Sequence, residues 1–267
     1  TPGTGNTDPT PSDSGSIVKI DAGLNTTRLD VVFLFDDSGS MDPIRDTLKA
    51  NIRQTAVNLQ QRGFDSQYGL IGYLGGPDSS EDTSLDQDMT SNVGALNQSL
   101  ENDLTFNGGT ENITNAIHES YTDAEFQRPS YQTNSRTVLV VATDEPDNGD
   151  APIADPRVRS LRTLNQEQGC FVAISSDSTG DDQPRTWATG GTVSSTNEGS
   201  VTLDNPGGWI DSGSLDSSLD DELTSKILSW AADGTDSDNE SLTDNTEDAP
   251  GTDPHDADND EDGIDDP

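Results

Sequence analysis

Apolar residues gather along the chain in two patterns, short unbroken runs and stripes at helical spacing. Four runs carry apolar residues on both faces, which is typical of strands that helices cover on each side. They are LDVVFLF at residues 29–35, YGLIGYL at 68–74, TVLVVA at 137–142 and CFVAI at 170–174. These runs predict the central, parallel strands of an open sheet.

Between and after these runs, apolar residues recur every three or four positions, which is the period of an amphipathic helix. The stripes cover residues 44–59, 93–104, 113–124, 158–164 and 219–230, and we expect the last helix to end near Gly234. Strands that alternate with helices indicate an α/β fold. We therefore predict a doubly wound, mostly parallel sheet with helices on both faces.

Differences in amino-acid composition divide the chain into three segments. Residues 1–16 contain only small, polar and proline residues and predict a flexible linker. Residues 17–232 hold the alternating strands and helices, and residues 233–267 hold 15 acidic residues with no lysine or arginine. The chain begins at Thr1 rather than at methionine, so we expect it to be a processed or excised piece of a longer protein.

The charge of the chain narrows the classes of partner. Against 51 acidic residues stand 13 basic ones, which gives a formal net charge of −38. The net charge disfavours nucleic acids and anionic membrane surfaces as partners and favours cations. This excess resembles that of proteins from extreme halophiles, such as a halophilic archaeon or its virus. A calcium-loaded secreted protein of an ordinary marine organism is the alternative.

Two further features limit the interpretation. Cys170 is the only cysteine, so no intramolecular disulfide can form, and its place in an apolar run predicts a small core residue. No stretch approaches the roughly 18 consecutive apolar residues of a membrane span, so we expect no direct membrane insertion in this segment.

Oxygen-bearing side chains follow the predicted strands at three places. Asp36, Ser38 and Ser40 lie in DDSGS, Thr110 lies in NGGTENI before a helix, and Asp144 lies in VVATDEPDN. In open parallel sheets, ligands bind beyond the carboxyl ends of the strands, where such loops converge. Taken alone, DDSGS also fits a strand-to-helix turn with a helix cap.

Other site chemistries fit these residues less well. Neither glycine-rich segment ends in the Gly-Lys-Ser/Thr of a phosphate-binding loop. Ser38 and Ser40 lack the Gly-x-Ser-x-Gly setting of a hydrolase nucleophile, and the two histidines are His118 and His255. His118 follows the apolar residue Ile117, which favours a place at the surface or boundary of a helix. We therefore expect no enzyme activity.

The spacing Asp-x-Ser-x-Ser, followed by Gly-Gly-Thr and a strand-terminal Thr-Asp, resembles the von Willebrand factor type A domain and its metal-ion-dependent adhesion site (MIDAS). The resemblance covers about residues 28–232. It implies a metal site of five residues: Asp36, Ser38, Ser40, Thr110 and Asp144. The expected ion is Mg²⁺, or Mn²⁺ or Ca²⁺, with hydroxyls as direct ligands and aspartates often acting through water. One coordination position then stays open for an acidic group of a partner.

Two details near this site are less typical. Glu145 and Pro146 follow Asp144 where the family often has glycine, which could alter how that loop moves. Asp42 and Asp46 fit either a second cation site or an exposed acidic first turn of a helix, and the second interpretation is favoured.

The acidic tail carries a repeat of its own. Asp258, Asp260, Asp262, Gly263 and Asp266 fit D-x-D-x-D-G-x-x-D, which resembles the calcium repeats of thrombospondin type 3. An earlier copy has the acids Asp236, Asp238, Glu240 and Asp244, with Ser241 in place of glycine. Alternating acids followed by glycine suit a loop around Ca²⁺. An EF-hand and a solvated tail without ions stay open as alternatives.

These features together predict a binding protein. We expect an extracellular adhesion or ligand-binding module, displayed on a cell surface, filament or virion, with a calcium-stabilised stalk. Its partner would be a protein or glycan surface ligand with an acidic group, and assembly with other subunits of a surface structure is compatible with the sequence. The alternatives are a structural spacer or assembly subunit and, less favoured, a chelatase-type subunit working with an ATPase.

Overall fold

The computed structural model describes nine ranges of the chain. They are residues 28–73, 83–104, 113–122, 129–133, 135–144, 156–175, 183–195, 197–214 and 218–232. The predicted linker 1–16, the tail 233–267 and Thr110 lie outside these ranges.

Strands and helices alternate through the described residues. The strands are β1 (Arg28–Asp36), β2 (Asp65–Tyr73), β3 (Thr83–Thr90), β4 (Arg136–Ala142), β5 (Cys170–Ser175), β6 (Val193–Ser195), β7 (Gly199–Val201) and β8 (Pro206–Asp211). The α-helices are α1 (Arg45–Gln61), α2 (Val93–Asn102), α3 (Ile113–Thr122), α4 (Pro156–Gln166), α5 (Gln183–Ala188) and α6 (Leu219–Ala232). Two short 3₁₀ helices, η1 (Gly39–Met41) and η2 (Ser212–Ser214), follow β1 and β8.

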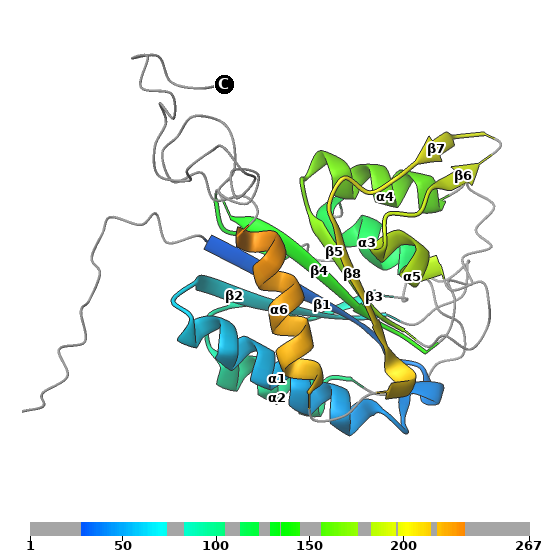
Figure 1. The fold of residues 1–267 in the computed structure, drawn as a ribbon. Coiled ribbons are helices and arrows are strands. Elements are labelled where there is room, and N and C mark those ends of the chain that lie inside the picture. The colour runs from blue at the N-terminus through cyan, green and yellow to red at the C-terminus, as the bar shows by residue number, and fades with distance from the viewer. Residues whose placement is uncertain are drawn as a thin grey trace, which may run out of the picture.

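Six strands form one sheet in the order β3-β2-β1-β4-β5-β8 (Figure 1). All neighbouring strands are parallel except the pair of β2 and β3. From β1 the chain proceeds outward through β2 and β3, and from β4 it proceeds the other way through β5 and β8. The order therefore reverses between β1 and β4, which is where open α/β sheets bind ligands.

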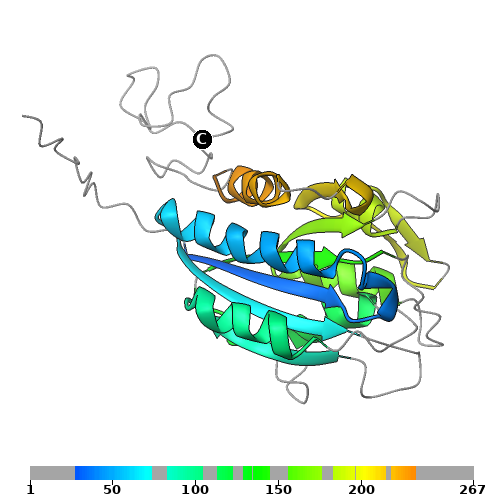
Figure 2. The ribbon, with the colours of Figure 1, turned by 90° about the horizontal axis from the view of Figure 1, so that it is seen from below.

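Strand β1 divides the interior into two cores because its side chains alternate between the two faces of the sheet. Leu29, Val31, Phe33 and Phe35 pack with α1, α2 and α6, whereas Val32 and Leu34 pack with α3, α4 and α5. Seen from below in Figure 2, α1 and α6 lie side by side over the sheet, and Asn58 of α1 donates a hydrogen bond to Asp220 of α6. The predicted doubly wound sheet is confirmed.

The four predicted strands correspond to β1, β2, β4 and β5, and each has a neighbour on both sides. The edge strands β3 and β8, the β6-β7 hairpin and the short helix α5 are additions to the prediction. Cys170 is fully buried, as expected for a core residue. Burial raises the pKa of its thiol to about 12, so the thiol is protonated at neutral pH.

Candidate metal site at the carboxyl edge of the sheet

The topology brings two of the predicted loops together at the carboxyl edge of the sheet. β1 ends at Asp36, and β4 ends at Ala142, which pairs with Phe35 in the parallel register. Thr143 and Asp144 therefore leave β4 beside Asp36. Figure 2 shows the chain turning from the tip of β1 into η1 and then returning along α1. Ser38 and Ser40 lie in this turn, so the two strands deliver all these oxygens to the switch point.

Asp36 is held in a fixed orientation by hydrogen bonds to both carboxylate oxygens. The backbone N–H of Ser38 donates to Oδ1 at 2.8 Å, and the Thr143 hydroxyl donates to Oδ2 at 2.8 Å. The side chain is fully buried. Burial raises the pKa of Asp36 to about 6, the hydrogen bonds from Ser38 and Thr143 oppose that rise, and repulsion from Asp144 adds to it. A buried carboxylate beside a second carboxylate is an environment that a cation would stabilise.

Ser38, Ser40 and Asp144 form a chain of oxygens next to Asp36. The two serine hydroxyls lie 2.8 Å apart, and Ser40 Oγ donates to Asp144 Oδ1 at 3.1 Å. Ser38 is buried and Ser40 is exposed, so this row of oxygen atoms extends from the interior to the surface. The structure thus brings together four of the five predicted metal ligands.

The backbone around this chain is anchored from both sides. The N–H of Asp37 donates to the carbonyl of Tyr73 at the end of β2, at 3.0 Å, and the N–H of Thr143 donates to the carbonyl of Ile174 in β5, also at 3.0 Å. Met41 is fully buried against the core on the α1 side. The loops that carry the oxygens are therefore tied to strands on either side of the switch point.

The oxygens suit a hard divalent cation. Mg²⁺ and Mn²⁺ prefer oxygen ligands, and Mg²⁺ commonly binds through one or two carboxylates with the remaining positions filled by other oxygens. Here Asp36 uses both its carboxylate oxygens internally, whereas the oxygens of Ser38, Ser40 and Asp144 converge. Among the described residues, no three His, Cys, Asp or Glu side chains form a group that could hold a metal. The group at the ends of β1 and β4 differs from such clusters, because Ser38 and Ser40 contribute hydroxyls rather than His, Cys, Asp or Glu side chains.

The structure also locates the second acidic pair near this site. Arg45, at the start of α1, contacts Asp42 at 2.6 Å and Asp46 at 3.0 Å, and both aspartates are largely exposed. These ion pairs support the interpretation of an acidic first helical turn, because Arg45 already engages both carboxylates and offsets one of their two charges.

Sequence reasoning missed the role of Thr143. It recognised the strand-terminal Thr-Asp pair but assigned only Asp144 to the site. Thr143 is 1% exposed, and its hydroxyl is one of the two donors that orient Asp36. A threonine that directly follows a strand, and whose neighbouring strand ends in a buried aspartate, is the signal that could have found it.

A doubly wound sheet with oxygen-bearing side chains gathered at its switch point is typical of α/β domains that bind ligands at that edge of the sheet. The model of the von Willebrand factor type A domain matches residues 30–184, more than half of the chain, and the chain belongs to this family. Comparison with curated proteins found no match. None of the helices that the structure describes is long and apolar enough to cross a membrane.

Several solved structures share the fold. Proximal thread matrix protein 1 from the mussel byssus has a TM-score of 0.54 at 14% identity, over 77% of this chain and 48% of that chain. The pilus adhesin SpaC from Lactobacillus rhamnosus GG has a TM-score of 0.54 at 14% identity, over 78% of this chain and 31% of that chain. A von Willebrand factor type A protein from Catenulispora acidiphila has a TM-score of 0.51 at 14% identity, over 77% and 43% of the two chains.

A second structure of the byssus protein, with a zinc-occupied MIDAS motif, has a TM-score of 0.52 at 12% identity, over 76% of this chain and 46% of that chain. This chain spans less than half the length of each of these structures. At such identities the likeness concerns the fold.

Proposed function

We propose that this chain is an extracellular adhesion or ligand-binding module that uses a divalent cation at the strand-end site to bind a carboxylate of a partner. The observation that carries this proposal is the convergence of Ser38, Ser40 and Asp144 beside the buried Asp36. Thr110, which lies outside the described residues, is the fifth proposed ligand. The adhesin and the matrix protein that share the fold agree with a surface role.

The balance of charge in the site explains why a partner carboxylate would bind. Two carboxylates and neutral hydroxyls leave a divalent ion with local attraction for a further anion, whereas three or four carboxylates would reverse its charge. When bound, the ion supplies this electrophilic position. Asp36, held by Ser38 and Thr143, fixes the turn that presents the hydroxyls, and Asp144 faces them from the second loop.

The first experiment measures binding of Mn²⁺ and Mg²⁺ by calorimetry. Ser38→Ala and Asp144→Ala should each weaken binding by about tenfold or more, since each removes a ligand oxygen. Ser194→Ala is the matched control for the serine, because Ser194 also pairs with another serine hydroxyl, that of Ser200 at 2.8 Å, but on the β6-β7 hairpin. Asp221→Ala, on the exposed first turn of α6, is the control for the aspartate.

The second experiment tests whether one position on the ion is open. Acetate added to the Mn²⁺-loaded protein should displace a bound water and lower the enhancement of water-proton relaxation. Equal metal binding by the site variants and their controls would refute the metal site. Metal binding with no response to acetate would instead favour a structural spacer whose ion only ties the loops together.

The remaining parts of the proposal concern segments outside the described residues. We propose that residues 1–16 are a linker and that residues 233–267 bind Ca²⁺ as a stalk, through the two acidic repeats around Asp236 and Asp258. The acidic composition supports an origin in a high-salt environment, in a halophilic archaeon or its virus.

A further inference from the structure

Tyr73, the last residue of β2, contacts both loops that carry the candidate cation site. Its backbone carbonyl accepts the N–H of Asp37 at 3.0 Å, and its phenolic hydroxyl donates to the carbonyl of Ala142 at 3.4 Å. Asp37 lies in the turn after β1, and Ala142 is the last residue of β4. Because β1 lies between β2 and β4, this one residue links two strands that are not neighbours.

The phenol of Tyr73 crosses β1 on the face of the sheet that carries Asp36. Tyr73 pairs with Asp36 in the parallel register, and paired residues project from the same face of a sheet. Tyr73 also packs in the core that contains Val32 and Leu34, which share that face by alternation. The side chain is fully buried. To reach Ala142 from β2, the ring must therefore pass next to the end of β1.

The bond to Ala142 holds the peptide group that leads into the second loop of the site. The carbonyl of Ala142 and the N–H of Thr143 belong to one planar group. The carbonyl accepts from Tyr73, and the N–H donates to the carbonyl of Ile174 in β5 at 3.0 Å. A planar group held from both sides cannot turn freely. The two bonds therefore help to fix the direction in which Asp144, the next residue, leaves β4.

We propose that Tyr73 is a positioning residue of the cation site, which holds the Asp144 loop in place relative to the turn that carries Ser38 and Ser40. This inference rests on the proposed cation site. Mg²⁺ demands near-octahedral ligand geometry, so the spacing of the two loops matters for binding. A buried side chain that bonds to both loops keeps this spacing before the ion arrives, which lowers the entropic cost of binding.

The test compares two tyrosines on the same strand. Tyr73→Phe removes the hydroxyl and keeps the ring, and it should weaken Mn²⁺ binding by about threefold or more. Its melting temperature should change little, because 3.4 Å is long for a bond between two oxygens. Tyr68→Phe is the matched control, because Tyr68 is also fully buried and donates to a backbone carbonyl, that of Ala56 in α1 at 2.8 Å. Tyr68 packs in the opposite core, so its variant should lose more stability but bind Mn²⁺ like the unaltered chain.

A second readout needs no metal. In the metal-free protein, the backbone ¹⁵N–H signals of Thr143 and Asp144 should shift in Tyr73→Phe, because the peptide group before them loses a hydrogen bond. The same two signals should stay in place in Tyr68→Phe. A role of Tyr73 in general stability alone would not produce this difference.

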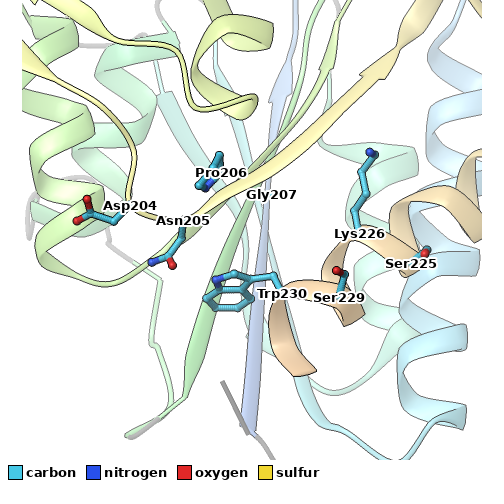
Figure 3. A pocket seen from close by; sticks show the side chains of 8 residues that line it. All are labelled: Asp204, Asn205, Pro206, Gly207, Ser225, Lys226, Ser229 and Trp230. Carbon is cyan, nitrogen blue, oxygen red and sulfur yellow. The ribbon is translucent and has the colours of Figure 1, made fainter. Parts of the chain in front are cut away.

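Mn²⁺ that binds elsewhere is separated by two further variants. Binding that Ser38→Ala removes belongs to the strand-end site, so ions held by other acidic segments do not enter the comparison. The described residues also form a cavity of about 390 Å³ between the start of β8 and the second half of α6, and its lining includes Asp204 and Lys226 (Figure 3). The charge of Lys226 disfavours a cation there, so Asp204→Asn should leave Mn²⁺ binding unchanged.

The outcomes distinguish the role of Tyr73 from the cation site itself. Equal Mn²⁺ affinity of Tyr73→Phe and the unaltered chain, with weaker binding by Ser38→Ala, would overturn the role of Tyr73 and leave the cation site standing. Unchanged binding by Ser38→Ala would refute the cation site. A Tyr73→Phe protein that melts well below Tyr68→Phe would show that the hydroxyl supports the fold as a whole, and the positioning role would then be wrong.

Discussion

Replacing Thr143 by valine removes the hydroxyl that donates to Asp36 Oδ2 at 2.8 Å while nearly preserving the shape of the side chain. Both residues are essentially buried, so water cannot easily replace the lost donor. A hydrogen bond to a charged group contributes about 1.5–3 kcal/mol. At roughly 2–4 °C per kcal/mol for a domain of this size, the melting temperature should fall by roughly 3–12 °C.

The measurement is thermal unfolding of the metal-free protein in high salt at neutral pH, where Asp36 is ionised. Thr143→Ser keeps the hydroxyl and should recover most of the loss. Thr143→Val should also weaken Mn²⁺ binding, because Asp36 is then held by Ser38 alone among its two described donors. A Thr143→Val protein that is as stable as the unaltered chain and binds Mn²⁺ equally would show that this hydrogen bond does not position Asp36.

Other predictions concern acidic groups. Burial, opposed by the hydrogen bond from Ser84, raises the pKa of Asp86 from 3.8 to about 6. Between these two pH values the folded protein keeps a proton that the unfolded chain releases, so stability falls as pH rises, and Asp86→Asn should flatten part of this fall in a series of thermal melts. Asp88 lies on the same strand; burial raises its pKa, but hydrogen bonds from Ser130 and Met89 lower it by more, so the net shift is downward. Asp88→Asn should therefore reduce stability at neutral pH and have little effect in acid. Matching pH profiles for the Asp86 and Asp88 variants would contradict both assignments. Residues 233–267 carry 15 of the 38 net negative charges, so 23 net negative charges remain on the rest of the chain. Because the screening length shortens from about 10 Å at 0.1 M salt to about 3 Å at 1 M, their repulsion weakens and the melting temperature should rise with salt. A melting temperature that does not change with salt would refute the halophilic interpretation. Proteolysis within residues 233–267 should be slower in Ca²⁺ than in EDTA, and replacing Asp260 and Asp262 by alanine should reduce that difference.

The sequence predicted the centre of the fold better than its edges for a physical reason. β1, β2, β4 and β5 are covered on both faces, so apolar residues occupy most consecutive positions in them. β3 is an edge strand with the sequence TSLDQDMT, and it pairs with another strand on one side only. Edge strands commonly carry charged residues, so its acidic residues are tolerated and the apolar pattern is lost. β8 begins Pro-Gly-Gly, and Gly208 has a φ of 103° beside a register shift against β5, which hides the strand pattern.

The sequence likewise predicted part of the candidate site. The motif order predicted that Asp36, Ser38, Ser40 and Asp144 would lie together, because each ends a strand or lies in the turn that follows one. The structure brings these residues together, and their role as metal ligands stays a prediction. Thr143 was overlooked because its partner, Asp36, is 107 positions away in the chain, and only the register of β1 against β4 joins them.

The choice of hydroxyls at the strand-end site is informative because acidic residues are so abundant elsewhere. With 51 acids in the chain, a site built from carboxylates alone was readily available, yet Ser38 and Ser40 occupy the turn after β1. An all-carboxylate site would bind the cation more tightly but would leave no attraction for an anion. In the proposed site, two carboxylates and neutral hydroxyls would balance the charge of the ion without reversing it, so the ion could still accept a partner's carboxylate in a protein whose overall field repels acidic partners. Salt should therefore help an acidic partner to bind, because it screens the long-range repulsion between the two molecules but acts little on a direct bond between an ion and a carboxylate.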